Sequence, residues 1–445
     1  MVDQVKKTSL KKSLNLLSLT FYGVGLIIGA GIYSVIGEAA GLAKEGLWLS
    51  FLLGATLALL TALSYAELTT RYPTAGAEYV YAQKAFPDLK WLSFLLGFIL
   101  LLAGTATATT VAMAFAGYLK SLADFPTLVS AGGLLILCGT LSILALKVSS
   151  LTNIVFTVIE VTGLLIVIYF GMSTKDFLEP LSTPLSQQLL PGILASAALI
   201  FFVYLGFEEI ANLAEETKNP RRTLPFSIFL SLGIATTLYV LVSLAVLALS
   251  SPEALSQSSS PLSLVLQNTS PRMGTFLGVV ALFATSNTAL ITIVALSRMV
   301  FAMARNGALP KVFAKVSRGG NAPWTATLLV VGFCFLLLPL GSLEILAGIS
   351  SFGALVGFSM IHVFLIVLRF KEPSATYHFK VPLSIGKLPL FPLTGLIASI
   401  LFLTQFERQV YVVGGVAILL SFLVYGVLTR LRRHPNSSTG PIKVI

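Results

Sequence analysis

The sequence predicts an all-α integral membrane protein organised around two helices that are interrupted near their middles. Hydrophobic residues make up 56% of the 445 positions and charged residues only 11%, whereas soluble domains are about 25% charged. Apolar stretches long enough to cross about 30 Å of hydrocarbon recur along the whole chain. Glycines interrupt two of these stretches, which lie five stretches apart. Composition and spacing therefore favour many transmembrane helices.

Twelve stretches are expected to span the membrane, because each approaches the roughly 20 apolar residues that cross a bilayer. They lie at 14–36, 47–67, 91–119, 128–147, 151–171, 191–214, 225–250, 275–304, 324–340, 343–368, 389–405 and 409–430. With a cytoplasmic N-terminus, only five of the 29 Lys and Arg residues fall on the outer side: Lys44, Lys120, Lys175, Arg272 and Arg408. The net charge of +11 therefore follows topology, with both termini cytoplasmic, and indicates contact with membrane lipids and no nucleic-acid partner.

The first stretch carries glycines at positions 23, 25, 29 and 31. Glycine costs a helix interior about 0.8–1.0 kcal/mol relative to alanine, so the cluster weakens the middle of this helix. We expect a break at Ile28–Ile32, where freed amides at the start of the second half-helix would suit an anion. The alternative is that small residues merely let two helices approach closely.

The sixth stretch contains Gly206, followed by Glu208 and Glu209 at membrane depth. Equivalent segments five helices apart have opposite orientations, which is the arrangement of an inverted repeat with a binding site at the midplane. This correspondence favours a true break in the first stretch. The outer loop Ser250–Pro271 is rich in Ser and Pro and is expected to be irregular.

Four motifs follow one another between residues 23 and 310. They are Gly23-Val-Gly-Leu-Ile-Ile-Gly-Ala-Gly-Ile-Tyr33, Ala66-Glu-Leu-Thr-Thr-Arg-Tyr-Pro-Thr-Ala-Gly76 followed by Glu78-Tyr79-Val-Tyr81, Phe202-Val-Tyr-Leu-Gly-Phe207 with Glu215-Glu-Thr-Lys-Asn-Pro-Arg-Arg222, and Arg298-Met-Val-Phe-Ala-Met-Ala-Arg-Asn-Gly-Ala-Leu-Pro310. They resemble motifs of the amino acid–polyamine–organocation (APC) superfamily of permeases, and are similar to its cationic amino acid transporter branch and bacterial relatives.

The resemblance implies a leucine-transporter-type fold with a 5+5 inverted repeat and alternating access. The implied parts are a cytoplasmic tail (1–13), repeat one (14–171, spans 1–5), repeat two (191–368, spans 6–10), two peripheral spans (389–430) and a cytoplasmic tail (431–445). Helices 1 and 6 would be the broken ones.

The resemblance also places an amino acid between the two breaks. Its carboxylate would bind the amides of Gly29, Ala30 and Gly31, where no Cβ at 29 or 31 blocks the backbone. The remaining predicted contacts are the carbonyls of Ile27, Phe202, Val203 and Leu205, which would bind the ammonium, together with Ile32 at the break and Asn287 in span eight. In that span, Ser286-Asn287-Thr288 fits either a sodium site or interhelical hydrogen bonding, and we favour the latter.

Glu160 lies in the middle of span five. A carboxylate at the bilayer centre costs at least about 2.5–3.5 kcal/mol, so it should face the protein interior. Proton-coupled APC members carry a lysine near this point, and we expect Glu160 to be a coupling or gating carboxylate. The alternatives are a helix–helix contact and recognition of a cationic substrate. Glu208 is a further gating candidate, and Tyr204 and Phe207 fit either a gate or an apolar pocket.

The function expected from these features is secondary active amino acid transport in the cell membrane, by proton symport or amino acid exchange. The expected coupling ion is a proton, with sodium as the less favoured choice. No ATP-binding motif, metal-ligand spacing or hydrolytic set occurs in the sequence, so no cofactor and no enzymatic activity are expected. The alternatives are a polyamine transporter of the same fold and a membrane amino acid sensor. The transported amino acid and the oligomeric state stay open.

Overall fold

The computed structural model describes residues 14–433 except 75–76, 145–149, 183, 185, 268, 306, 318–321 and 373–377. Its α-helices are α1 Leu16–Ile28, α2 Gly31–Ala43, α3 Leu47–Arg71, α4 Ala77–Ala85, α5 Lys90–Ala123, α6 Thr127–Ile143, α7 Ser150–Met172, α8 Glu179–Ser182, α9 Leu190–Ile200, α10 Glu209–Asn212, α11 Pro220–Leu249, α12 Pro252–Gln257, α13 Pro261–Gln267, α14 Pro271–Arg305, α15 Trp324–Leu337, α16 Leu343–Lys371, α17 Leu390–Leu403 and α18 Arg408–Arg433. The 3-10 turns are η1 Lys44–Gly46, η2 Gln187–Leu189, η3 Phe201–Tyr204, η4 Ala214–Glu216, η5 Lys311–Ala314 and η6 Leu338–Leu340. Strands β1 Ser384–Ile385 and β2 Leu388–Pro389 form an antiparallel pair.

The helices confirm a multi-pass membrane architecture. Among the described residues, eight helical stretches are long and apolar enough to cross a bilayer: Gly31–Arg71, Lys90–Ala123, Ile154–Met172, Gln187–Asn212, Pro220–Leu249, Pro271–Arg305, Leu343–Lys371 and Arg408–Arg430. Four shorter apolar helices are Leu16–Ile28, Thr127–Ile143, Trp324–Leu340 and Leu390–Leu403. The all-helical class is confirmed, whereas twelve crossings and the inverted repeat remain predictions.

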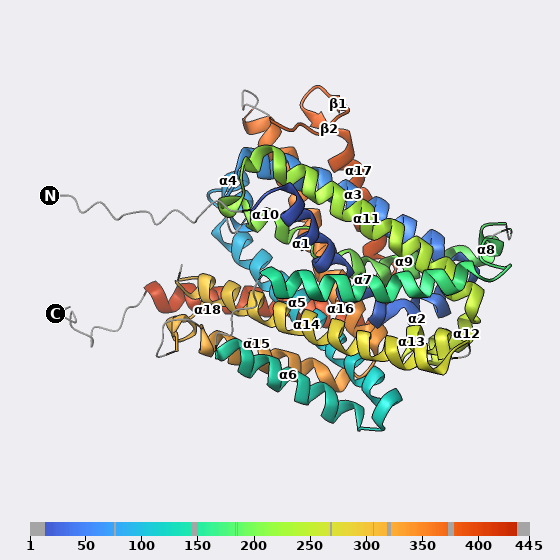
Figure 1. Ribbon diagram of the computed structural model, residues 1–445. Helices are drawn as coiled ribbons and strands as arrows, with labels where there is room; N and C mark the ends of the chain where they lie inside the picture. The colour runs from blue at the N-terminus through green and yellow to red at the C-terminus, as the bar shows by residue number, and fades with distance from the viewer. Residues whose placement is uncertain are drawn as a thin grey trace.

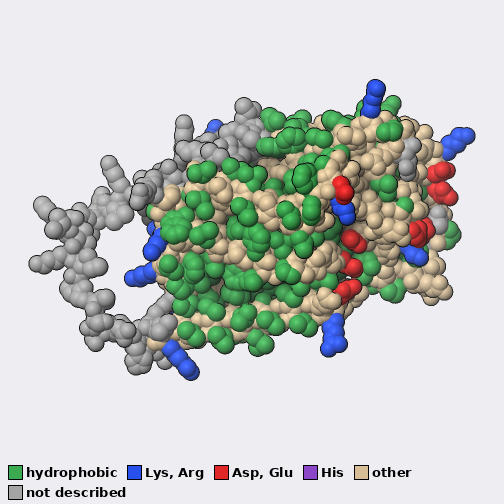
Figure 2. All heavy atoms as spheres, turned by 90° about the horizontal axis from the view of Figure 1, so that it is seen from below, with side chains coloured by type: hydrophobic (Ala, Val, Ile, Leu, Met, Phe, Trp, Pro, Cys, Tyr) green, Lys and Arg blue, Asp and Glu red, His purple; other side chains and the backbone are tan. Residues whose placement is uncertain are grey.

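Hydrophobic side chains face outward over a broad band of the molecule, and charged side chains lie along both borders of this band and at the far end (Figure 2). Exposed apolar residues are numerous on the outer helices, for example Leu336 of α15 at 73% and Leu419 of α18 at 70%. A contiguous apolar surface of this kind marks contact with lipid. The 34 residues of α5 would span about 50 Å, more than the hydrocarbon thickness, so this helix must tilt or extend beyond the bilayer.

Two groups of helices enclose the interrupted segments. In one group α5 packs between α14 and α16, and in the other α3 packs along α11. The helix α1 contacts α11 and α7, while α2 contacts α9, so the breaks lie in the interior where both groups meet (Figure 1). The start of the described chain pairs with the exit of the sixth segment, because Leu14 and Thr217 form a parallel bridge.

The prediction of an irregular loop at Ser250–Pro271 is wrong, because this stretch contains α12 and α13. Each begins with a proline at its first helical position, where the fixed φ suits a helix and no amide hydrogen is needed. The Ser251 side chain also accepts a hydrogen bond from the Ala254 amide at 3.3 Å, which caps α12. Residues 1–13, which form the predicted N-terminal tail, lie outside the described residues. So do residues 434–445 of the predicted C-terminal tail.

Candidate functional site

The first break lies between α1 and α2. Gly29 has φ +26°, a conformation that favours glycine, and its amide donates to the Gly25 carbonyl at 3.1 Å. The Ala30 amide instead donates to the Thr288 hydroxyl of α14 at 2.9 Å. A Cβ at position 29 would come within 2.9 Å of the same hydroxyl. Thr288 therefore makes an interhelical hydrogen bond to the break, as favoured for this polar cluster.

The second break separates α9 from α10. The chain tightens into η3, extends at Leu205 with ψ 144°, and turns at Gly206 with φ +119°. The Gly206 amide donates to the Glu208 carboxylate at 2.8 Å, so Glu208 holds the turn itself. A Cβ on Gly206 would lie 3.1 Å from the backbone of Leu26 in α1. Glycine is thus required both by the turn and by the packing of one broken segment on the other.

The two breaks meet at Gly31 and Val203. A Cβ on Gly31 would lie 3.0 Å from the Val203 Cα, which is closer than side chains normally pack. The Ile27 carbonyl at the end of α1 and the Val203 carbonyl of η3 converge on one group, the Tyr239 hydroxyl of α11. The distances are 2.6 Å and 3.0 Å. Carbonyls from both breaks, which the motifs assign to one ligand, therefore face the same point.

The other predicted contacts lie around this point with different roles. Ala30 and Ile32 are fully buried, and Phe202 is 4% exposed. The Phe202 carbonyl accepts a hydrogen bond from the Leu205 amide at 3.3 Å, so it is already used within η3. Asn287, 8% exposed, lies beside Thr288 on α14.

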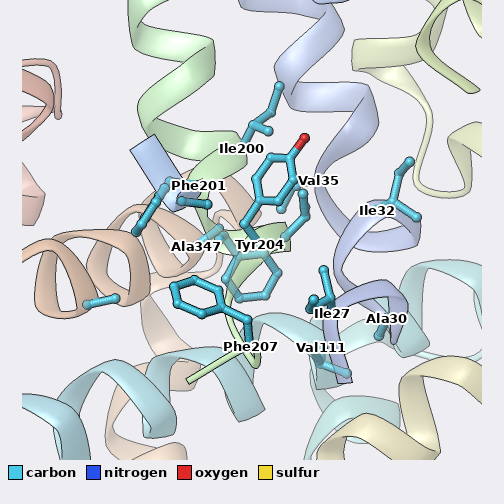
Figure 3. Close-up of a cluster of buried hydrophobic side chains, with 14 of the residues drawn as sticks. Ile27, Ala30, Ile32, Val35, Val111, Ile200, Phe201, Tyr204, Phe207 and Ala347 are labelled. Carbon is cyan, nitrogen blue, oxygen red and sulfur yellow. The ribbon is translucent and has the colours of Figure 1, made fainter. Parts of the chain in front are cut away.

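Aromatic side chains of the sixth segment pack beside the breaks. Tyr204 donates to the Phe51 carbonyl of α3 at 3.0 Å, and its ring lies 5.4 Å from that of Tyr239. The Phe207 ring lies 5.9 Å from Tyr65 of α3 and 5.7 Å from Phe358 of α16. Figure 3 shows Phe201, Tyr204 and Phe207 in one buried cluster with Ile27, Ala30 and Ile32. These rings bridge the two helix groups.

Glu160 of α7 is 1% exposed and faces the protein interior, as expected. Neither of its carboxylate oxygens accepts a hydrogen bond of ordinary length from a described residue. The side chain of Asn287 is one polar group that interacts with it, and the Tyr33 hydroxyl donates to its backbone carbonyl at 2.8 Å. A buried carboxyl group thus lies next to α2 and α14 without a described cationic partner.

A second acidic group lies beyond the break, outside the spanning segments. Glu78 of α4 accepts a hydrogen bond from the Tyr65 hydroxyl at 3.1 Å. Burial, together with the neighbouring charge of Glu209, raises the pKa of Glu78 from its ordinary 4.5 to about 7. The Asn212 side-chain oxygen accepts a hydrogen bond from the Ala77 amide at 3.0 Å, and this bond holds α4 against α10. Glu78 belongs to the second of the four sequence motifs, which begins at Ala66, but the spacing of that motif alone assigns it no role.

Sequence reasoning missed the Glu67 cluster, which we define as Glu67, Arg369, Val381 and Ser384. Glu67 of α3 and Arg369 of α16 form an ion pair and are at most 2% exposed. Arg369 also donates to the Ser384 hydroxyl at 2.6 Å and the Val381 carbonyl at 3.1 Å. The Val381 amide donates back to Glu67 at 2.8 Å. The cluster ties the two helix groups and the α16–α17 connection together.

Tyr239 is the other residue that sequence reasoning missed. The available signal was a tyrosine within an apolar helix, since a buried hydroxyl usually needs a partner. Its partners depend on the rotation of α11, which one sequence does not give. Within the described ranges, no group of three or more His, Cys, Asp or Glu side chains is placed to hold a metal ion.

Comparison with known proteins adds an independent line of evidence. The family model described as "Amino acid permease" matches residues 14–430. The chain is 30% identical to the branched-chain amino acid permease BcaP of Bacillus subtilis over 397 residues, which cover 84% of each chain. It is 30% identical to the methylthioribose transporter of the same organism, covering 85% of this chain and 86% of that one. It is 32% identical to human cationic amino acid transporter 4, covering 88% of this chain and 64% of that one.

Proposed function

Because this chain belongs to the amino acid permease family of the APC superfamily, we propose that it is a secondary active amino acid transporter. It works by alternating access, either as a proton-coupled symporter or as an amino acid exchanger. The proposed location is the cell membrane, with the N- and C-termini in the cytoplasm. The proposed fold is of the leucine-transporter type, with residues 14–171 and 191–368 as the inverted repeats.

The convergence of the two breaks is the observation that carries this proposal. Two carbonyls from different segments, those of Ile27 and Val203, lie within 3.0 Å of one hydrogen-bond donor. Such a pair of acceptors suits an ammonium group, which has several N–H donors. About one helical turn away, α2 begins after Gly29 and Ala30, and the start of this 13-residue helix carries the positive end of its dipole. The two charge preferences match the two ends of an amino acid zwitterion.

The proposed carboxylate seat consists of the amides at Gly29, Ala30 and Gly31, of which the Gly29 amide must first release the Gly25 carbonyl, to which it donates at 3.1 Å. The Ala30 amide now donates to Thr288, so a bound carboxylate takes over this hydrogen bond. Phe207 closes the space between the helix groups by contacts to both α3 and α16, and Tyr204 packs against α3 and α11 beside it. These contacts must loosen when one helix group moves against the other.

Glu160 is the proposed proton carrier. An ionised carboxylate without hydrogen bonds in a low-dielectric interior is costly, so it gains from taking up a proton. Its interaction with Asn287 and the Tyr33 contact link it to α14 and α2, which border the first break. Protonation of Glu160 can therefore change the packing beside the substrate seat. No role in proton transfer is assigned to Glu208, whose carboxylate binds the Gly206 amide.

The relatives' names define the substrates to test, because they cover branched-chain amino acids, cationic amino acids and methylthioribose. The experiment is uptake of radiolabelled amino acids, putrescine and methylthioribose into proteoliposomes with an imposed pH gradient, with and without sodium. Accumulation of an amino acid that follows the proton gradient supports symport. Uptake only into amino acid-loaded liposomes supports exchange.

Three outcomes would contradict the proposal. Uptake of putrescine but of no amino acid indicates the polyamine alternative. Uptake of methylthioribose alone indicates a carrier of uncharged substrates. Such substrates have no carboxylate or ammonium group for the two proposed seats to bind. Saturable amino acid binding without flux indicates a sensor.

A further inference from the structure

The hydroxyl of Tyr239 lies where the two broken segments present their carbonyls. Tyr239 is fully buried in α11, and its ring packs on Phe51 at 5.6 Å and on Tyr204 at 5.4 Å. These ring contacts fix the hydroxyl 2.6 Å from the Ile27 carbonyl oxygen and 3.0 Å from the Val203 carbonyl oxygen. Both distances are in the range of hydrogen bonds.

One hydroxyl cannot satisfy both acceptors fully. A phenol has a single O–H donor, whereas the two carbonyls offer up to four lone pairs. At any moment one carbonyl takes the proton and the other has at best a shared contact. A primary ammonium group carries three N–H donors and a positive charge, and it can satisfy both carbonyls at once with stronger, charge-assisted bonds.

Other buried tyrosines of this protein bind differently. Tyr118 of α5 donates to one carbonyl, that of Tyr33 in α2, at 3.0 Å. Tyr204 likewise donates to the single carbonyl of Phe51. Tyr239 contacts two interrupted segments that are separated by about 175 residues in the chain and adjacent in space. Its bridge is therefore specific to the place where the breaks meet.

We propose that the Tyr239 hydroxyl is an internal substitute for the α-ammonium group of the substrate: it competes for the Ile27 and Val203 carbonyls and is displaced when an amino acid binds. This inference rests on the proposed function and adds a residue that sets binding strength. In the unloaded transporter the hydroxyl supplies the donor that holds the two breaks together. The empty binding site can then reorient to the opposite side of the membrane without leaving two buried carbonyls unpaired.

Tyr239→Phe removes the competitor and keeps the ring. Both carbonyls then lose their donor in the unloaded protein, and a buried unpaired acceptor disfavours that state by roughly tenfold or more. An ammonium group therefore gains more by binding to the variant than to the wild type. The same loss slows the return of the unloaded transporter, so net uptake falls relative to exchange.

The test compares each amino acid with the analogue that lacks its α-amino group. The pairs are L-leucine with 4-methylpentanoate and L-lysine with 6-aminohexanoate, and the readout is the ratio of their dissociation constants in purified protein. We expect Tyr239→Phe to raise the preference for the amino acid about tenfold, because the analogue has no α-ammonium to bind the carbonyls. Tyr118→Phe, which also removes one buried tyrosine hydroxyl, should leave the ratio unchanged.

An unchanged or reduced preference in Tyr239→Phe would overturn the inference, since a merely structural tyrosine would weaken both ligands equally. If this variant does not fold, 3-fluorotyrosine at position 239 replaces it; this stronger donor should lower the preference, and an unchanged ratio would again contradict the inference. A wild-type protein that binds none of the twenty common amino acids contradicts the proposed function itself. Binding by the wild type with no change in the variant removes only the role of Tyr239.

Discussion

Replacing Glu160 by glutamine tests the proposed coupling at little cost to the fold. The substitution keeps the shape of the side chain and removes its ionisable proton. A hydrogen bond typically contributes about 0.5–1.5 kcal/mol to stability. Neither carboxylate oxygen of Glu160 accepts a hydrogen bond of ordinary length from a described residue, so the variant loses no such contribution. Asn287 is close enough to pair with the new amide. We expect the free energy of unfolding to change by less than about 1 kcal/mol.

The effect on transport should be much larger. One proton moved with each amino acid makes a pH difference of one unit worth about 1.36 kcal/mol, or about tenfold accumulation. A gradient of 1.5 units should drive about 30-fold accumulation in the wild type by the same relation. Glu160→Gln should only equilibrate the amino acid, while exchange in preloaded liposomes continues without the wild-type pH dependence.

The assay is uptake into proteoliposomes at fixed internal pH over a series of external pH values, alongside thermal unfolding of the same preparations. Glu67→Gln is the matched control, because it alters a buried glutamate that makes three hydrogen bonds and leaves Glu160 intact. It should lower stability and keep the pH profile. An unchanged pH profile in Glu160→Gln, with accumulation retained, would refute the coupling role.

Three further substitutions test the packing and charge around the breaks. Gly31→Ala places a Cβ 3.0 Å from the backbone of the sixth segment and should lower the free energy of unfolding by about 1–3 kcal/mol and abolish most of the uptake. Gly233→Ala, whose Cβ would have nothing within 4 Å, should change neither quantity. Equal uptake by both variants would contradict the close packing of the two breaks. Glu67→Gln leaves the buried Arg369 charge without a carboxylate partner, so thermal unfolding should show a loss of about 3–5 kcal/mol, and a loss below about 1 kcal/mol would disprove the importance of the pair. Because the folded protein holds the Glu78 proton more tightly than the unfolded chain, ionisation costs up to about 3 kcal/mol of stability as the pH rises from 4.5 to 7. The melting temperature of Glu78→Gln should therefore fall less than that of the wild type between pH 5 and pH 8. Parallel plots of melting temperature against pH for the two proteins would argue against this titration of Glu78.

The breaks could be located from sequence because their cause is local. Clustered glycines weaken a helix wherever they occur, and the structure has a positive φ at Gly29 and Gly206, within both predicted breaks. The correspondence of the two interrupted segments also pointed to one shared site. The carbonyls of Ile27 and Val203 converge accordingly.

The remaining features depend on helix rotation and on distant contacts. The Tyr239 hydroxyl reaches the breaks only because α11 turns that face inward. Glu67 and Arg369 are 302 positions apart, and no local pattern pairs them. Glu208 is a gating candidate from its depth alone, and the sequence does not show that its carboxylate accepts a hydrogen bond from the Gly206 amide two residues before it. Short helices in the loop after α11 were missed because proline was interpreted as a breaker and not as a first helical residue.

A structure of the protein with its transported amino acid bound is the most direct test of the central claim. We expect the carboxylate to lie within about 3 Å of the amides at Gly29–Gly31. The ammonium should lie within about 3 Å of the Ile27 and Val203 carbonyl oxygens, with the Tyr239 hydroxyl moved away from at least one of them. Density for the amino acid elsewhere, with both Tyr239 hydrogen bonds intact, would contradict the proposed substrate site between the two breaks.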